Sequence, residues 1–466
     1  MSGRTGETAV PQAPRLQKTA LRGFSGLDRR PGVREGCLSA CAGLDPRALP
    51  ALGTMPTPVL YHSGPAGETL ALQVIGSALF RVYVREGSLH LARYGQDGSY
   101  SAIGLPGSDL TTPRTLLAYN LYSNPSNPLS GSYRHMALLY PDRLAFSPDS
   151  TQLVIEMLGG SGHIPDIDTA CVHLSRVFGV HEDRLYASAF NNPRNWNLDT
   201  ATDIDPSHAW ASTVQSNTRA SGHFTAVTVY GGQVLAFKRR FCHVLYNNKN
   251  PFRIGDLLTV GALDGRTVAE VGGKLFFVGE EGVYRYNGDS ASLFSEPLGT
   301  VNFSGALAVG AAGLYWLCLP AEGRVFLWSE ESGAWGALPA FCEGRITAMA
   351  ATPRGCCLID EGGRLYTTEG GSYGDLSATT SPVLAEAVGR TTRLSVAVTA
   401  APGATFSLSY TDTQGRTTPL LAGVGNGRSR RVESRSFTPA DYGGTLCLTG
   451  HGNLTLHDMI IETAES

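Results

Sequence analysis

Two short segments concentrate side chains of the kinds that bind metal ions. The segment "GHIPDIDTACVH" carries His163, Asp166, Asp168, Cys171 and His173. The segment "DTATDIDPSH" carries Asp199, Asp203, Asp205 and His208. Neither has the Gly at position 6 and the Glu at position 12 of a calcium loop, and neither has zinc-site spacing. We interpret both as polar loops, with a bound calcium ion as the alternative, and expect no cofactor.

No residues with the spacing of a catalytic site stand out. "GGSGH" places Ser161 among glycines, but a nucleophile elbow needs Gly where His163 stands. "SEESGAWG" resembles the Asp-box of sialidases, a structural hairpin, with Glu331 replacing Asp and Trp335 one position early. We therefore expect a protein that is not an enzyme. The alternative, a diverged glycosidase, requires two carboxylates about 5–10 Å apart in a central pocket.

The most distinctive local string is "NNPRNWN", residues 191–197. Asn-Pro and Arg-Asn pairs favour turns, and a Trp beside them can anchor a turn against a neighbouring element. We therefore select Asn192, Pro193, Asn195 and Trp196 as a structural or interaction motif. Stacking of a sugar on Trp196 is the alternative.

The first 36 residues are basic although the whole chain has a net charge of −3. They hold seven Arg or Lys against three acidic residues, so the remainder of the chain carries −7. Residues 1–52 also lack a sustained strand pattern. We predict an irregular N-terminal arm, flexible or docked on a partner, with Arg29, Arg30 and Arg34 as candidate interaction residues.

The composition indicates elements that are strands rather than helices. The 466 residues include 56 Gly and 26 Pro, and only 17% are charged. A helical bundle would have far less Gly, and a disordered chain would have fewer than the 42% hydrophobic residues found here. Long, Gly-rich and charge-poor sequences of this kind are typical of all-β proteins with many turns.

A strand–Gly–strand unit recurs along the middle of the chain. Its copies begin near Tyr140, Val180, Val229, Val271, Val309 and Ala351, at intervals of 38 to 49 residues. Four-stranded antiparallel units at this period are typical of β-propeller blades, because a single blade cannot bury both of its faces. With an earlier cluster around "ALFRVYV", the sequence predicts about seven blades, six or eight being the alternatives.

The strand pattern of the sequence changes after residue 378. Strands such as "RLSVAVTA" and "ATFSLSY" follow without the 40-residue period, which predicts a small antiparallel β-sandwich or jelly-roll-like domain. The predicted organisation is therefore an arm over 1–52, a propeller over 53–378 and a sandwich over 379–466.

Two further features concern the compartment. The uncharged run from Pro297 to Ala321 is long enough to span a bilayer, but its glycines and polar residues predict two short strands around a turn instead. The nine cysteines show no metal or redox spacing, and the N-terminus has no apolar signal segment. We therefore expect no membrane span, no secretion by a standard signal and a reducing compartment.

Several strings resemble a recurring bacteriophage virion protein. They are "RVFGVHEDRLYASAFNNPRNWN", "GHFTAVTVYGGQVLAFKRRFCHVLYNNKNPFRI" and "FFVGEEGVYRYNGDSASLFSEPLG". The opening "FSGLDRRPGVREGCLSACAGLDPRALPAL" is similar to the start of prophage structural proteins, with Gly43 where those have Asn. The ending "LCLTGHGNLTLHDMII" is similar to their terminal β-domain.

The resemblance implies a tail-hub, nozzle or tail-stabilisation component of the tail or head–tail connector. Such proteins form rings below the portal, so the implied partners are further copies of the chain, portal, adaptor or other tail proteins, and transiently the packaged DNA. The implied location is the virion, assembled in the bacterial cytoplasm. The main alternative is a carbohydrate- or receptor-binding propeller, which predicts an exposed aromatic cluster that includes Trp196, Trp316 or Trp335.

Overall fold

The chain consists of strands joined by turns. The computed structural model describes residues 16–21, 23–32, 36–76, 78–96, 98–104, 115–122, 132–140, 143–147, 154–157, 164–198, 205–212, 222–247 and 249–464. These residues contain no α-helix, only short 3-10 helices at Pro46–Ala48, Gly265–Thr267, Glu296–Leu298 and Ala385–Ala387. Two compact units are formed, one by Pro56–Gly333 and Ala340–Ser372 and the other by Met1–Met55, Ala334–Pro339 and Tyr373–Ser466.

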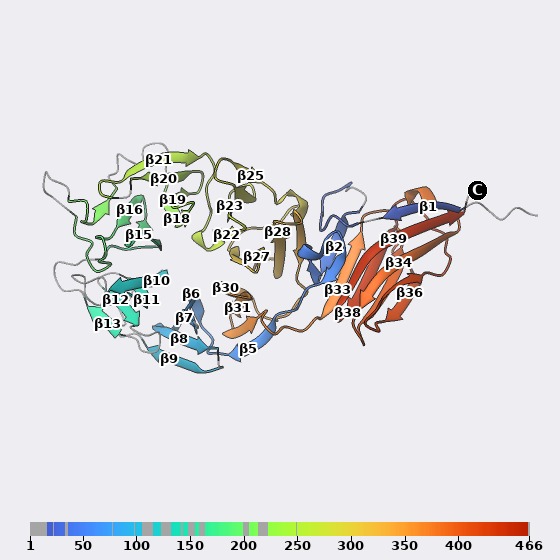
Figure 1. Ribbon diagram of the computed structural model, residues 1–466, viewed down its shortest axis with the longest axis horizontal. Helices are drawn as coiled ribbons and strands as arrows, with labels where there is room; N and C mark the ends of the chain where they lie inside the picture. The colour runs from blue at the N-terminus through green and yellow to red at the C-terminus, as the bar shows by residue number, and fades with distance from the viewer. Residues whose placement is uncertain are drawn as a thin grey trace, which may run out of the picture. The chain divides into compact units, whose positions relative to one another are not determined.

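Seven four-stranded antiparallel sheets form a β-propeller, and Figure 1 shows them arranged around a common centre. Six blades are built from consecutive strands: β6–β9 (Glu68–Ile75, Ala78–Arg85, Ser88–Gly95, Tyr100–Gly104), β10–β13 (Thr115–Tyr122, Ser132–Tyr140, Arg143–Ser147, Val154–Met157), β14–β17 (Thr169–His173, Arg176–His181, Arg184–Ala187, Trp210–Ala211), β18–β21 (Phe224–Tyr230, Gln233–Lys238, Cys242–Tyr246, Arg253–Leu258), β22–β25 (Ala269–Val271, Lys274–Val278, Val283–Tyr286, Ala291–Leu293) and β26–β29 (Leu307–Ala311, Leu314–Leu319, Arg324–Ser329, Ala334–Ala337). The all-β propeller predicted from the sequence is confirmed.

The seventh blade closes the ring with a strand from the other end of the propeller segment. Strands β30 (Ile346–Thr352), β31 (Gly355–Asp360) and β32 (Arg364–Thr367) are completed by β5 (Val59–Ser63), which pairs with β32. From β5 the chain passes directly to β6, the inner strand of the first blade. The first and last parts of the propeller are therefore held together by backbone hydrogen bonds.

Apolar side chains fill the space between neighbouring blades. One buried cluster joins Phe237 and Val244 of the fourth blade to Leu275 and Phe277 of the fifth. Another joins Leu79 of the first blade to Ile359 of the seventh. Because each blade covers the face of the next, the strand sequences are apolar on both faces, as in β27, all six residues of which are buried.

Glycines at the tight turns explain much of the unusual composition. In the β22–β23 hairpin Gly272 and Gly273 have φ of +57° and +73°, a left-handed conformation that favours glycine. Gly231 and Gly232 occupy the equivalent hairpin of the preceding blade with φ of +58° and +75°. The recurring glycines therefore mark the same turn in successive blades.

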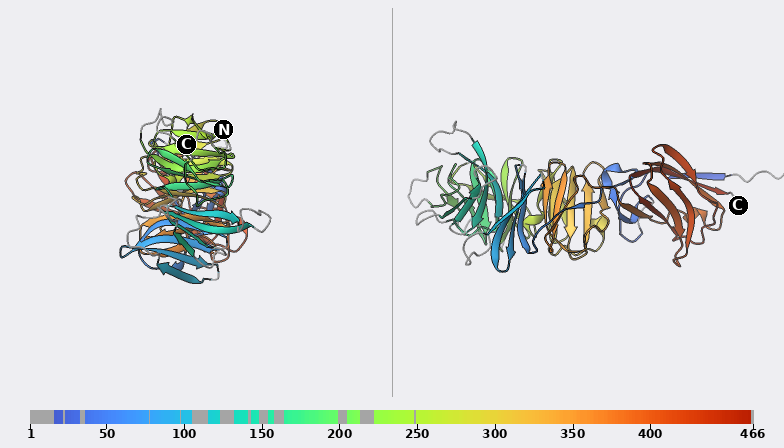
Figure 2. Two further views of the ribbon diagram at one scale, coloured as in Figure 1. Left: turned by 90° about the vertical axis from the view of Figure 1, so that its left-hand side faces the viewer. Right: turned by 90° about the horizontal axis from the view of Figure 1, so that it is seen from below.

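The second unit is a two-sheet sandwich. One sheet has the order β3-β4-β39-β34-β37 with β1 also paired to β39, and the other has the order β2-β33-β38-β35-β36. Their bounds are β1 Leu16–Leu21, β2 Leu38–Ala42, β3 Leu44–Asp45, β4 Leu52–Thr54, β33 Asp375–Thr380, β34 Thr392–Ala400, β35 Thr405–Thr411, β36 Thr417–Val424, β37 Ser429–Glu433, β38 Thr445–His451 and β39 Leu454–Ala464. The right-hand view of Figure 2 shows these strands from a second side.

The prediction of an irregular arm over residues 1–52 is wrong for its described part. Strand β1 pairs with β39, β2 with β33, and β4 with β39, so this segment supplies strands to both sheets of the sandwich. The predicted boundary at 378 likewise falls inside β33, a sandwich strand. These strands are short and take their hydrogen bonds from residues more than 300 positions away, so they leave little local alternation in the sequence.

The repeat itself was located with one error of register. Val229, Val271, Val309 and Ala351 all lie in the innermost strand of a blade, whereas Tyr140 and Val180 lie one strand later, in β11 and β15. The shift shortens the interval between Val180 and Val229, which would exceed 49 residues if it were counted from β14; the extra length lies between β16, which ends at Ala187, and β17, which begins at Trp210. The run 297–321 contains strands β26 and β27 around a turn, as predicted, and no helix in the described residues is long and apolar enough to cross a bilayer.

Candidate functional site

The "NNPRNWN" string forms a closed turn after β16. The backbone N–H of Asn195 donates to Asn192 O at 3.2 Å, and the N–H of Ala189 donates to Asn195 O at 2.8 Å. The side-chain oxygen of Asn192 accepts from the N–H of Arg194 at 3.1 Å, and that of Asn195 accepts from the N–H of Asn197 at 3.0 Å. Both asparagines are thus used to fold their own turn.

The indole of Trp196 points into the core instead of towards solvent. Its exposed fraction is 5%, and its Nε1–H donates to Pro193 O at 2.8 Å. It packs with Ile164, Ile167 and Val177, and with Leu117 of the preceding blade. Trp316 and Trp335 are exposed by 0% and 1%. These three tryptophans therefore do not form the exposed aromatic cluster expected for a glycan-binding face, and Trp196 has no free ring face for a sugar.

We expect Trp196→Ala to lower the free energy of unfolding by about 3–5 kcal/mol, the usual cost of removing a buried Trp. Leu198→Ala is the matched control, because Leu198 lies two residues away and is 49% exposed, and it should change stability by less than about 0.5 kcal/mol. Chemical denaturation followed by tryptophan fluorescence compares the two. Equal midpoints for both variants would contradict the anchoring role.

The basic candidates of the N-terminal segment are only partly described. The Arg30 guanidinium binds Asp28 through Nε at 2.9 Å and Nη2 at 2.6 Å, so its charge is already matched within its own turn. Arg29 is half-buried, and Arg34 lies outside the described residues. Of the two arginines that the structure describes, Arg30 is therefore held by Asp28, and the prediction for Arg34 stays untested.

The two acidic and histidine-rich segments do not converge on a metal site in the part of the chain that the structure describes. Asp168 lies 3.0 Å from Nδ1 of His181, and Asp205 accepts from the N–H of Ser207 at 2.7 Å. His163, Asp199 and Asp203, like Ser161, lie outside the described residues. The described carboxylates therefore serve local turns and pairs.

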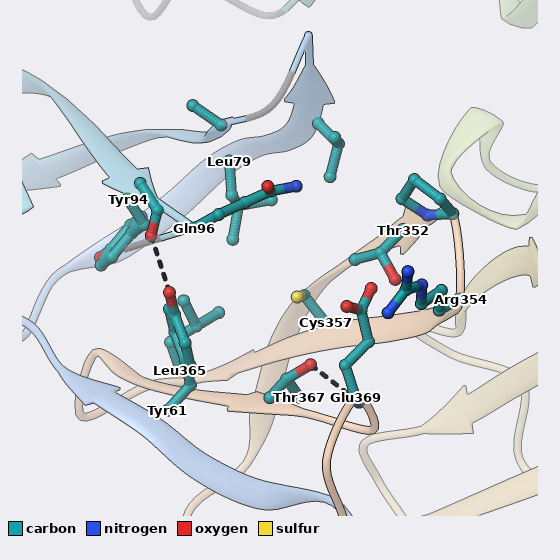
Figure 3. Close-up of a pocket in the computed structure, with 14 residues that line it drawn as sticks. Tyr61, Leu79, Tyr94, Gln96, Thr352, Arg354, Cys357, Leu365, Thr367 and Glu369 are labelled. Atoms are coloured by element: carbon teal, nitrogen blue, oxygen red, sulfur yellow. Dashed lines mark hydrogen bonds between the residues drawn. The ribbon is translucent and has the colours of Figure 1, made fainter. Parts of the chain in front are cut away.

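A cavity of about 510 Å³ lies between the first and seventh blades, and Figure 3 shows its lining residues. Its walls come from the turns at one end of both blades and from the closing strand: Tyr61 of β5, Val74, Ala78, Leu79, Tyr94, Gly95 and Gln96 of the first blade, and Thr352, Pro353, Arg354, Cys357, Leu365, Thr367 and Glu369 of the seventh. This volume is in the range of small-molecule sites.

The cavity has an apolar floor and a polar rim. Leu79, Cys357 and Leu365 are at most 7% exposed, whereas Arg354 and Glu369 are exposed. The Tyr61 hydroxyl donates to Gly95 O at 2.7 Å and so joins the closing strand to the first blade. Glu369 is the single carboxylate among the lining residues, so the paired carboxylates expected of a glycosidase are not found in this cavity.

Burial controls the chemistry of the one thiol on the cavity floor. Burial raises the pKa of Cys357 to about 11, the Glu369 carboxylate contributes in the same direction, and a hydrogen bond with Thr367 opposes them. The thiol is therefore protonated at neutral pH, and since the thiolate is the nucleophile, Cys357 is a weak one there. An unfolded thiol ionises near pH 8.5, so the retained proton lowers folding stability as pH rises from about 9 to 11.

Alkylation of Cys357 by iodoacetamide should accelerate about tenfold from pH 9 to pH 10, because the thiolate fraction grows tenfold per unit below the pKa. Free glutathione in the same tube should change far less, since an ordinary thiol is already mostly ionised at pH 9. Peptide mapping by mass spectrometry measures both rates. A Cys357 rate that levels off at pH 9 would show an ordinary thiol.

No motif in the sequence indicates this cavity. Tyr61 lies about 300 residues from Arg354 and Glu369, and the three come together only because β5 closes the seventh blade. Arg354 and Glu369 occur in ordinary turn strings, "TPRG" and "TTEGG". The cavity could have been anticipated only if the pairing of β5 with the last blade had been predicted. That pairing places Tyr61 next to the turns of the first and seventh blades.

Comparison with known proteins finds β-propellers among solved structures. No family model matches the chain, and no curated protein matches it either. Virginiamycin B lyase from Staphylococcus aureus is 8% identical with a TM-score of 0.46, covering 67% of this chain and 97% of that one. YCF48 bound to D1 peptide is 10% identical with a TM-score of 0.46, covering 67% and 97%. The WD40 domain of Toxoplasma gondii coronin is 10% identical with a TM-score of 0.35, covering 77% and 86%.

These likenesses are too distant to carry an argument about activity, substrate or partners. The assignment of the fold stands on the strand pairing within the seven sheets.

Proposed function

We propose that the chain is a structural protein of a bacteriophage virion, a ring-forming scaffold of the tail or head–tail connector. The sequence strings that resemble phage virion proteins are the reason for naming this class. The observation that supports a scaffold is the path of the chain: its first described strands, β1–β4, lie in the sandwich, the chain then builds the propeller, and it returns to the sandwich through β33–β39.

This path ties down both ends of the propeller segment. The last strand before the propeller, β4, pairs with β39, and the first strand after it, β33, pairs with β2 and β38. Because both ends of the propeller segment continue into paired strands, neither end of that segment can fray. This suits a component that must keep its shape while other subunits pack on it. A closed ring of such subunits would use heterologous contacts between copies.

In the proposed role the partners are further copies of the chain, portal, adaptor or other tail proteins, and transiently packaged DNA. The alternative is a receptor- or glycan-binding propeller at the tail tip. Burial of the three tryptophans weighs against that alternative, because they cannot form the exposed aromatic surface it requires.

Two measurements test the proposal together. Particles purified from a producing culture should contain the chain in stoichiometric amounts by mass spectrometry. The purified chain, or the chain mixed with its portal neighbour, should form closed rings in negative-stain images and a multiple of the 49.4 kDa monomer mass by light scattering. A chain that stays monomeric at high concentration and is missing from particles is not a virion scaffold.

A further inference from the structure

The cavity between the first and seventh blades holds an unused pair of opposite charges. In the described part of the chain neither Arg354 nor Glu369 has an oppositely charged partner within 4.0 Å. Figure 3 shows both side chains at the same side of the cavity, beside Cys357 and above Thr367. The Thr352 hydroxyl beside them is buried and has no hydrogen-bond partner among the described residues. The rim therefore offers a donor, an acceptor and a hydroxyl that the fold itself does not use.

The charges on this rim select against a strongly charged ligand. An anion is attracted by Arg354 but repelled by Glu369. A cation is attracted by Glu369 but repelled by Arg354. The propeller unit as a whole has 22 Arg and Lys against 28 Asp and Glu, a net charge of −6, which further disfavours nucleic acid. A neutral group that carries both a donor and an acceptor satisfies the two side chains at once, and a peptide amide is such a group.

The floor selects for a hydrocarbon side chain. Val74, Ala78, Leu79 and Leu365 contribute apolar surface, and the Cys357 thiol acts as a small hydrophobe at neutral pH. A sugar would place hydroxyls against this floor without partners, which costs free energy. A Leu-sized side chain buries its surface there favourably.

We propose that this cavity binds a short uncharged peptide segment, with an apolar side chain on the floor and a main-chain amide between Arg354 and Glu369. The Arg354 guanidinium donates to the peptide carbonyl, and the Glu369 carboxylate accepts from the peptide N–H. Because Tyr61 of β5 also lines the cavity, a bound segment contacts the closing strand of the seventh blade, the other strands of that blade and the first blade. The site is independent of the proposed virion role.

The test uses three probes that differ by one charge: acetyl-Leu-Leu-amide, acetyl-Leu-Leu with a free carboxylate, and Leu-Leu-amide with a free amine. Isothermal titration with the full chain should give a Kd on the order of 0.1–1 mM for the neutral probe, and at least fivefold weaker binding for the two charged probes. Saturating neutral probe should also slow Cys357 alkylation at pH 9 at least fivefold, which locates the binding.

Two variants separate the roles of the rim. Glu369→Gln should improve the anionic probe and Arg354→Gln the cationic probe, each weakening the neutral probe about threefold or more. Arg345→Gln is the matched control, since Arg345 is an exposed side chain of the same blade, faces Glu361 at 3.5 Å and does not line the cavity. It should leave all three affinities unchanged.

Three outcomes would overturn the proposal. One is the absence of saturable binding of the neutral probe up to 10 mM, ~10-fold above the weakest expected Kd. Another is that Arg354→Gln and Glu369→Gln bind each of the three probes with the same affinity as Arg345→Gln. The third is protection of Cys357 by tri-N-acetylglucosamine without protection by the peptide, which would make the cavity a carbohydrate site. None of these outcomes depends on whether the chain forms rings.

Discussion

Replacing Arg81 with Ala should destabilise the propeller by about 4 kcal/mol, one of the two largest effects we expect from a single side chain. Arg81 is in β7 and is fully buried. Its guanidinium donates from Nε to the Thr69 hydroxyl at 2.9 Å, from Nη1 to Pro65 O at 2.8 Å and from Nη2 to Gly67 O at 2.9 Å. It also lies 4.3 Å above the Tyr83 ring.

The size of this effect follows from the groups to which Arg81 donates hydrogen bonds. Pro65 and Gly67 belong to the link between β5, which closes the seventh blade, and β6, which starts the first. Loss of the guanidinium removes the partner of the buried Thr69 hydroxyl, at about 1–3 kcal/mol, and of the part-buried carbonyls of Pro65 and Gly67, at a smaller cost each, and it opens a void in a fully buried position. Arg81→Lys should recover only part of the loss, because an ammonium cannot reproduce the planar fork.

The matched control is Arg85→Ala in the same strand. Arg85 is 52% exposed in its side chain, and among the described residues its charge has a surface pair with Glu86, so the change should stay within about 0.5 kcal/mol. Chemical denaturation gives the stability difference, and hydrogen exchange followed by mass spectrometry should show early loss of protection in β5. Arg81→Ala and Arg85→Ala with the same denaturation midpoint would mean that the closure does not rest on Arg81.

Replacing Leu44 with Asp should prevent the sandwich from folding, and Leu44→Ala should cost about 2–5 kcal/mol. Leu44 is in β3, has an exposed fraction of 0% and belongs to the core cluster that both sandwich sheets share. A carboxylate there would be desolvated without a partner, which is among the most expensive single changes. The segment that the sequence suggested as an irregular arm thus becomes essential for folding.

Leu16 provides the control for this prediction. It lies in β1 of the same segment but is 53% exposed, so Leu16→Asp should have a small effect. Soluble yield, circular dichroism and hydrogen exchange of β33–β39 distinguish the two variants. Normal folding of Leu44→Asp would show that the sandwich does not need the N-terminal strands to fold.

Composition and repeat spacing were sufficient for the propeller because they act locally. Gly272 and Gly273 mark a hairpin that needs left-handed backbone, and the apolar β27 marks a strand covered on both faces. Each feature arises from a few adjacent residues, so it is visible in the sequence. The same holds for Trp196. The neighbouring Asn and Pro residues indicate a turn, and Trp196 anchors that turn in the core.

The sequence by itself therefore determined the class of fold, the approximate number of blades and the positions of the turns. Only the tertiary structure decided that β1–β4 complete a sandwich begun by β33–β39, that β5 closes the propeller, and that Tyr61 meets Arg354 and Glu369 around one cavity. The physical reason is the range of the interactions: pairings across about 300 residues or more depend on which edge strand lacks a partner, and that is a property of the assembled sheets.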